Sequence, residues 1–130
     1  MKWDAARIGK SYSFSAAHYL TGVPDCHPCS KMHGHNYTVE VEVRGEVSPK
    51  TGFVIDFHEI DRHMKPLIAK LDHGLLNDLM DNPTAEVIAK YIMDKFPVKY
   101  LFSVTVWETD KCWAKVINAD GYYSHNDKIE

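Results

Sequence analysis

Apolar and polar side chains alternate between residues 33 and 44. The apolar positions are all odd-numbered: Tyr37, Val39, Val41 and Val43. A period of two is typical of a strand that buries one face. His33 and His35 share the odd positions with these apolar residues, so the pattern predicts a strand that points two imidazoles inward.

A second alternating stretch lies just upstream, over residues 8–18. Its even positions are mostly apolar, with Lys10 as the exception, and His18 ends it on the apolar side. If the two stretches pair as antiparallel strands, the end of the first lies beside the start of the second. His18, His33 and His35 would then meet at one corner of a sheet. Three imidazoles with an open position are typical of catalytic zinc, and we favour that interpretation over three hydrogen-bonded core histidines.

The second half of the chain carries two helical patterns followed by two further strands. Asp56 has the features of an N-cap, with Glu59 three residues later as in a capping box. Pro66 interrupts the first helical pattern and is expected to kink it or to break one hydrogen bond. The predicted elements are helices over 57–70 and from 82 to 96, then strands over 102–109 and 113–119.

The order strand, strand, helix, helix, strand, strand defines the predicted fold. Short links within each strand pair favour an antiparallel sheet, and both helices would cover one face. We therefore predict an α+β fold with a four-stranded antiparallel sheet, formed by a single domain over residues 1–130. The polar residues 120–130 are expected to be a loose tail.

Composition narrows the possible partners. The formal net charge is −3 with no basic run, which argues against nucleic acid, because such binding depends on clustered Lys and Arg. No apolar stretch approaches the roughly 20 residues of a membrane span. Three cysteines without an export signal favour reduced thiols in the cytoplasm.

Two cysteines precede the paired histidines. Cys29 lies four residues before His33, and a thiol near zinc has a lowered pKa and can act as base or nucleophile. Cys26 and Cys29 could instead act as a dithiol, or could join His33 and His35 in a closed structural zinc site. The closed site would leave His18 without a role.

Three further residues are candidates for proton transfer or substrate binding. Asp72 and His73 are adjacent, and neighbours on a regular helix do not face each other, so a dyad requires a loop or a pairing across subunits. The alternative is a polar helix end. Glu108 falls on an inward, otherwise apolar face, where an unpaired carboxylate is costly. It would suit the N–H groups of a guanine-like heterocycle, unless it sits at the strand end and reaches water.

Six ordered blocks between Ile8 and Ala119 resemble the 6-pyruvoyltetrahydropterin synthase superfamily. They are Phe14-Ser15-Ala16-Ala17-His18, Cys29-x-x-x-His33-Gly34-His35-Asn36-Tyr37, Gly52-Phe53-Val54-Ile55-Asp56-Phe57, Leu71-Asp72-His73-x-x-Leu76-Asn77, Asn82-Pro83-Thr84-Ala85-Glu86 and Trp107-Glu108-Thr109. Each block alone is weak, and together they are specific. The spacing from Cys29 to His33 resembles the carboxy-forming branch of the family, and Cys26 departs from the pattern.

The resemblance implies a T-fold, whose subunits assemble into barrels, typically as a homohexamer with active sites at subunit interfaces. It implies zinc as cofactor and a pterin triphosphate as substrate. The implied metal ligands are His18, His33 and His35. The implied catalytic residues are Cys29 as proton acceptor, Asp72 with His73 as a relay, and Glu108, which together with Thr84 would bind the pterin.

The activity implied is that of 6-carboxytetrahydropterin synthases in queuosine or other 7-deazaguanine biosynthesis. In that reaction 7,8-dihydroneopterin triphosphate is converted to 6-carboxy-5,6,7,8-tetrahydropterin, acetaldehyde and triphosphate. One alternative is a pyruvoyl-forming enzyme of the same family. The other is a non-enzymatic zinc module closed by Cys26, Cys29, His33 and His35.

Overall fold

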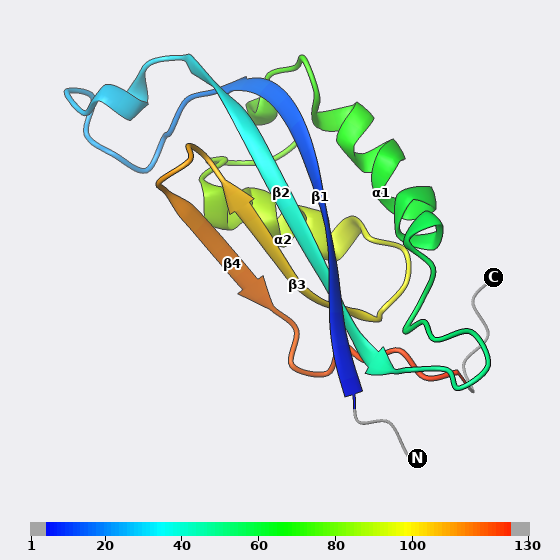
Figure 1. The fold of residues 1–130 in the computed structure, drawn as a ribbon. Helices are drawn as coiled ribbons and strands as arrows, with labels where there is room; N and C mark the ends of the chain where they lie inside the picture. The colour runs from blue at the N-terminus through cyan, green and yellow to red at the C-terminus, as the bar shows by residue number, and fades with distance from the viewer. Residues whose placement is uncertain (1–4, 126–130) are drawn as a thin grey trace.

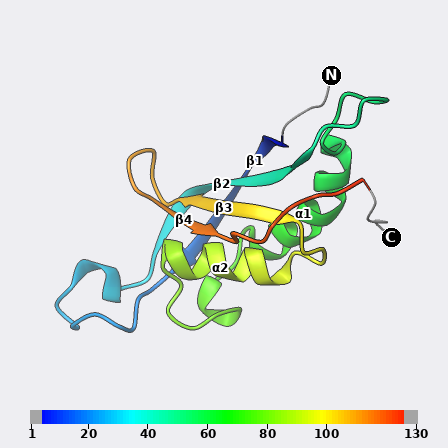
Figure 2. The ribbon, with the colours of Figure 1, turned by 90° about the horizontal axis from the view of Figure 1, so that it is seen from below.

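A single antiparallel sheet with both helices on one face forms the protein. The computed structural model describes residues 5–125. The strands follow the order β1-β2-β3-β4 and are β1 (Ala5–His18), β2 (His33–Glu46), β3 (Leu101–Trp107) and β4 (Trp113–Ile117). The helices α1 (Phe57–Leu71) and α2 (Ala85–Lys95) cover the same face of the sheet (Figure 1, Figure 2). The α+β class, the order of the elements along the chain and the placement of both helices on one face are confirmed.

The long β1–β2 hairpin has the register that the alternation predicts. Its last pair joins His18 to His33. Tyr37, Val39, Val41 and Val43 are fully buried against the helices. Lys10, the exception in the first pattern, also points toward the helices, where its ammonium group lies 2.6 Å from the carboxylate of Asp61 in α1.

Both helices begin at side-chain caps, of which Asp56 was predicted and Thr84 was not; α2 begins at Ala85 and not at residue 82. Asp56 accepts a hydrogen bond from the backbone N–H of His58 (2.9 Å), and Thr84 accepts one from Val87 (3.2 Å). These bonds satisfy N–H groups that have no partner inside the helix. The α1 helix continues through Pro66, and α2 ends directly before Phe96.

Two short 3-10 helices lie in the connections that surround the end of β1. They are η1 (Pro28–Ser30), between β1 and β2, and η2 (Leu76–Asp78), between α1 and α2. Leu75, just before η2, forms a parallel bridge with Ala17. The free edge of β1 is therefore covered near its C-terminal end.

The C-terminal segment differs from the predicted loose tail over the residues that the structure describes. The N–H of Tyr123 donates to the carbonyl of Arg44 (2.7 Å), and the carbonyl of Tyr123 accepts from Glu46 (3.3 Å). Gly121 is buried against the backbone of Leu101. Polar composition did not reveal these backbone hydrogen bonds, and residues 126–130 lie outside the described part.

The described helices are too short and too polar to cross a membrane.

Candidate metal and active site

Three imidazoles converge at the corner where β1 ends and β2 begins. The ligand nitrogens of His18, His33 and His35 all lie within 4.8 Å of one another. The Nε2 atoms of His18 and His33 are 2.9 Å apart. The cross-strand pairing of His18 with His33 produces this convergence, and His35 joins it because it lies two residues along the same face of β2.

The outer nitrogens of two of these rings are tied to backbone carbonyls. Nδ1 of His18 lies 2.7 Å from the oxygen of Pro83, and Nδ1 of His33 lies 2.7 Å from that of Lys31. A carbonyl only accepts hydrogen bonds, so each Nδ1 carries the proton. In the neutral rings both Nε2 lone pairs then face each other, an arrangement that favours a cation between them. Metal-binding histidines typically donate their second N–H in this way.

The third ring is also suited to a metal. Nε2 of His35 has no hydrogen-bond partner among the described residues and lies 3.5 Å from Oε1 of Glu108. Burial lowers the pKa of the His35 imidazole, and nearby His18 and His33 act in the same direction, while Glu108 opposes them. The neutral ring is thereby favoured, and neutral imidazole is the form that binds metal. Nitrogens about 2.0 Å from a tetrahedral zinc ion would be about 3.3 Å apart, close to the 2.9 Å between the Nε2 atoms of His18 and His33, so the triad is compatible with a metal site.

The cysteines do not join this cluster. Among the described residues, the one group of ligand atoms close enough to share an ion contains the three histidines and no cysteine. Cys26 is exposed, and Cys29 is half-buried within η1. The closed site of two cysteines and two histidines is therefore not assembled. His18, which would have no role in that alternative, is instead a member of the cluster.

Glu108 and Thr84 line one pocket of about 230 Å³, between the start of α2 and the β3–β4 hairpin. Glu108 follows β3 and keeps the inward side that its position predicts, with 27% of its side chain exposed. Its N–H donates to the carbonyl of Cys112 (2.9 Å). Cys112 and Glu86 line the same pocket and were not singled out from the sequence. Continuing the β3–β4 register past Trp107 would have placed Cys112 opposite Glu108.

Asp72 and His73 do form a dyad within the chain. Asp72 caps the end of α1, and His73 has a left-handed backbone with φ of 60°. This break in the helix brings Nδ1 of His73 to 2.8 Å from Oδ2 of Asp72. The backbone of Ser15 anchors both residues: its N–H donates to Asp72 Oδ1 (2.8 Å), and its carbonyl accepts from His73 (2.6 Å).

The dyad borders a depression that also reaches the triad. The His73 side chain is 83% exposed, and the open depression beside it, of about 410 Å³, is also lined by Ser15, Asn36 and the triad residue His35. Ser15 and Asn36 alternate with the inward residues of β1 and β2, so this depression lies toward the other face of the sheet.

Two asparagines fix the chain directly after His18. The side chain of Asn77 accepts from the N–H of Tyr19 (3.0 Å) and donates to its carbonyl (2.9 Å). Oδ1 of Asn82 accepts from the N–H of Thr21 (3.0 Å). Both belong to the sequence blocks described above, but no sequence pattern predicted these contacts.

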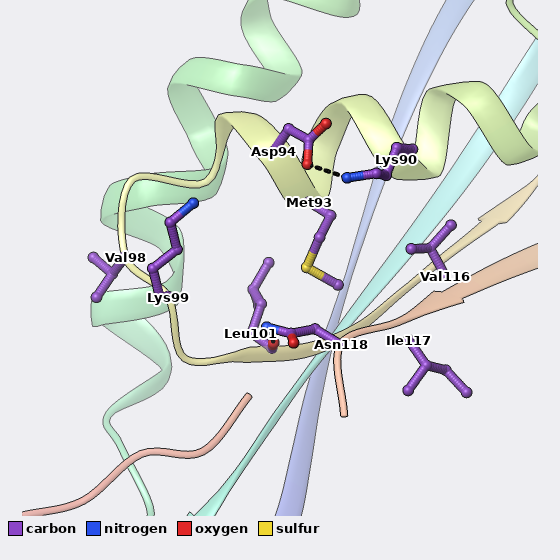
Figure 3. A pocket seen from close by; sticks show the side chains of 9 residues that line it. All are labelled: Lys90, Met93, Asp94, Val98, Lys99, Leu101, Val116, Ile117 and Asn118. Atoms are coloured by element: carbon purple, nitrogen blue, oxygen red, sulfur yellow. Dashed lines mark hydrogen bonds and ion pairs between the residues drawn. The ribbon is translucent and has the colours of Figure 1, made fainter. Parts of the chain in front are cut away.

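A separate pocket of about 310 Å³ lies between the C-terminal half of α2 and the end of β4 (Figure 3). Met93 extends into it from α2, and Lys90 is paired with Asp94 at its rim (2.5 Å). None of the predicted site residues lines it, so the candidate active site remains at the triad.

Known proteins are similar to this chain in sequence and in fold. A family model described as 6-pyruvoyl tetrahydropterin synthase matches residues 7–119. An Archaeoglobus fulgidus protein, provisionally named 6-carboxy-5,6,7,8-tetrahydropterin synthase, is 41% identical over 84% of this chain and 93% of its own length. The dihydroneopterin monophosphate aldolase of Pyrococcus furiosus is 39% identical over 69% of this chain and 74% of its own.

A 6-carboxy-5,6,7,8-tetrahydropterin synthase from Synechocystis is 38% identical over 78% of this chain and 85% of its own length. The 6-pyruvoyl tetrahydropterin synthase of Caenorhabditis elegans superposes with a TM-score of 0.82 at 28% identity, covering 91% of this chain and 99% of that one. The alternation, the histidine triad and these matches agree, and the chain belongs to the 6-pyruvoyl tetrahydropterin synthase family.

Proposed function

We propose that this protein is a zinc-dependent 6-carboxytetrahydropterin synthase. It converts 7,8-dihydroneopterin triphosphate to 6-carboxy-5,6,7,8-tetrahydropterin, acetaldehyde and triphosphate. The observation that carries the proposal is the convergence of three imidazoles, one of which, His35, lies 3.5 Å from the Glu108 carboxylate that lines the adjoining pocket.

The proposed metal is zinc, held by His18, His33 and His35. When bound, it supplies Lewis acidity that makes a carbon-bound proton of the substrate side chain easier to remove. The carbonyls of Pro83 and Lys31 keep two of the rings in the ligand tautomer. The fit of the donor set supports the choice of metal.

Glu108 and Thr84 are the proposed pterin contacts. The two oxygens of the Glu108 carboxylate accept hydrogen bonds from the amino group and an adjacent ring N–H of the pterin. Thr84 Oγ1 already accepts from the N–H of Val87, so its own hydroxyl proton remains available to the substrate. Their shared pocket supports both assignments.

Cys29 is the proposed proton acceptor, and Asp72 with His73 is the proposed relay. The N–H of Ser15 and the bond to His73 hold the pKa of the Asp72 carboxyl below its usual range. Ionised Asp72 therefore orients the His73 ring and leaves its second nitrogen outward, ready to exchange a proton.

We propose that this dyad serves the site of a neighbouring subunit in a homohexamer. Two observations support this arrangement. The His73 side chain is 83% exposed, and it borders the depression on the outer side of the β1–β2 hairpin. The three unpaired cysteines suit a cytoplasmic enzyme, and the product suits queuosine or another 7-deazaguanine pathway.

A product assay tests this function against two related ones. The Synechocystis and Archaeoglobus relatives and the three-residue spacing between Cys29 and His33 favour the carboxy-forming reaction. Zinc-loaded protein incubated with dihydroneopterin triphosphate should release acetaldehyde and 6-carboxytetrahydropterin. A pyruvoyl product, or turnover only of dihydroneopterin monophosphate, would contradict the proposal. The matched control is Cys29→Ala, which should retain zinc and release neither product.

A further inference from the structure

Cys26 is left without a role by the proposed chemistry. It begins the segment Cys26-His27-Pro28-Cys29, in the loop between β1 and β2. Figure 1 shows this loop projecting beyond the end of the sheet. Cys26 is exposed and Cys29 is half-buried, and neither is in a disulfide or in the metal cluster. Two free thiols, one of them the proposed proton acceptor, are thus separated by two residues.

Two successive turns form the backbone around Cys26 and Cys29. The N–H of His27 donates to the carbonyl of Pro24 (2.8 Å), and the N–H of Ser30 donates to the carbonyl of His27 (3.0 Å). Nδ1 of His27 accepts from the N–H of Cys29 (3.1 Å) and caps η1. Cys26 lies inside the first turn, Pro24 to His27, and Cys29 lies inside the second, His27 to Ser30, so the two turns meet between the cysteines. Rotation of the extended backbone at His27 would bring their Cα atoms within the roughly 4.4–6.8 Å that disulfides span.

We propose that Cys26 and Cys29 form a reversible disulfide that switches the enzyme off. The inference rests on the proposed function, since it blocks the thiol assigned as proton acceptor. Closing the pair consumes both thiols, so Cys29 can no longer take a proton from the substrate. The histidines stay free to hold their metal, because no cysteine belongs to the triad.

The oxidant is a small-molecule disulfide such as oxidised glutathione. The thiolate of Cys26, the more exposed of the two, attacks one sulfur of that disulfide and releases one glutathione thiolate, leaving a mixed disulfide. Cys29 thiolate then attacks the Cys26 sulfur and releases the second glutathione. The two cysteines lose two protons and two electrons in total, and one oxidised glutathione becomes two reduced molecules.

Titration of the zinc-loaded protein with glutathione buffers tests this switch. Intact-mass and peptide analysis should show a Cys26–Cys29 disulfide. At a fixed concentration of oxidised glutathione, the ratio of disulfide to dithiol should fall with the square of the reduced glutathione concentration, as required for a pair that releases two glutathiones. Turnover should fall more than tenfold in parallel, recover with dithiothreitol, and leave the zinc content unchanged. Glutathione adducts without the internal disulfide, or full turnover with the disulfide closed, would overturn the proposal.

Cys26→Ser is the matched variant. In the reduced state it should turn over substrate like the unaltered protein. Under oxidation it should carry only glutathione adducts, with a first-power dependence on reduced glutathione. Cys112→Ser should still form the Cys26–Cys29 disulfide, and a disulfide that required Cys112 would refute the assignment.

Failure of the proposed function would give a different result. In that case the reduced Cys29→Ala variant would turn over substrate normally, or the unaltered reduced protein would form no carboxypterin. The disulfide itself is measured by mass, so its formation is decided independently of turnover.

Discussion

Glu108→Gln separates substrate binding from metal binding within the candidate site. The substitution keeps the shape of the side chain but removes its charge and one acceptor oxygen. Hydrogen bonds to a charged group contribute about 1.5–3 kcal/mol, against about 0.5–1.5 kcal/mol for neutral ones. One pterin N–H would lose its acceptor and the other would keep a weaker bond.

The expected cost is reduced by solvent, because 27% of the Glu108 side chain is exposed. We therefore expect a loss near the lower end, about 2 kcal/mol of transition-state binding, or roughly a 30-fold fall in kcat/KM at about 1.4 kcal/mol per tenfold change. Zinc should remain bound, since the rings of His18 and His33 are oriented by backbone carbonyls and not by Glu108.

Steady-state kinetics and metal analysis on the same preparation provide the measurement. Glu40→Gln is the matched control, because Glu40 is an exposed carboxylate on the other face of the sheet, and it should leave kcat/KM unchanged. A loss below threefold with zinc retained would refute the role of Glu108 in pterin binding. Loss of zinc from Glu108→Gln would instead show that the carboxylate supports the metal.

Three further predictions concern the metal, the C-terminal segment and the ion pair between Lys10 in β1 and Asp61 in α1. His18→Ala should lose zinc by metal analysis while Cys29→Ala keeps it, and the reverse result would restore the closed zinc module. Gly121→Ala should lower the free energy of unfolding by about 1–3 kcal/mol in urea titrations, because an added Cβ would overlap a buried backbone carbonyl. Gly74→Ala, whose Cβ would lie 3.9 Å from the nearest atom, is its control. Hydrogen bonds from lysine and tyrosine partners keep the pKa of the Asp61 carboxyl below its usual value. The stabilisation that ionised Asp61 contributes is therefore complete above about pH 4 and is lost as the pH falls further. In that range the urea midpoint of Asp61→Asn should depend less on pH than that of the unaltered protein.

The sheet and the triad were accessible from sequence because a strand has a strict period. Once Tyr37 and Val39 are assigned to the buried face, the positions of His33 and His35 follow. The pairing of His18 with His33 then needs only the assumption of a hairpin, and the structure has that pairing. The same reasoning placed Glu108 on the inward side of the sheet.

Contacts made by irregular segments were not accessible in this way. The Pro83 carbonyl and the Asn82 side chain reach the end of β1 from more than 60 positions away in sequence, and loops carry no periodicity from which to infer such contacts. The Asp72–His73 dyad depends on the positive φ of His73, which residue type alone does not specify. The packing of Tyr123 against β2 was missed for a similar reason, because backbone hydrogen bonds leave little trace in composition.

The bond between His18 and Pro83 gives the proposed metal ion a structural role. Pro83 directly precedes Thr84, the cap of α2, so the His18 imidazole would connect a bound ion to the start of that helix. Occupancy of the proposed centre would thereby be coupled to the docking of α2 on the sheet. By mass action, ion at one hundred times its dissociation constant would add about 2.7 kcal/mol to global stability. Depletion of the ion would thus loosen the scaffold and remove the chemistry in a single event.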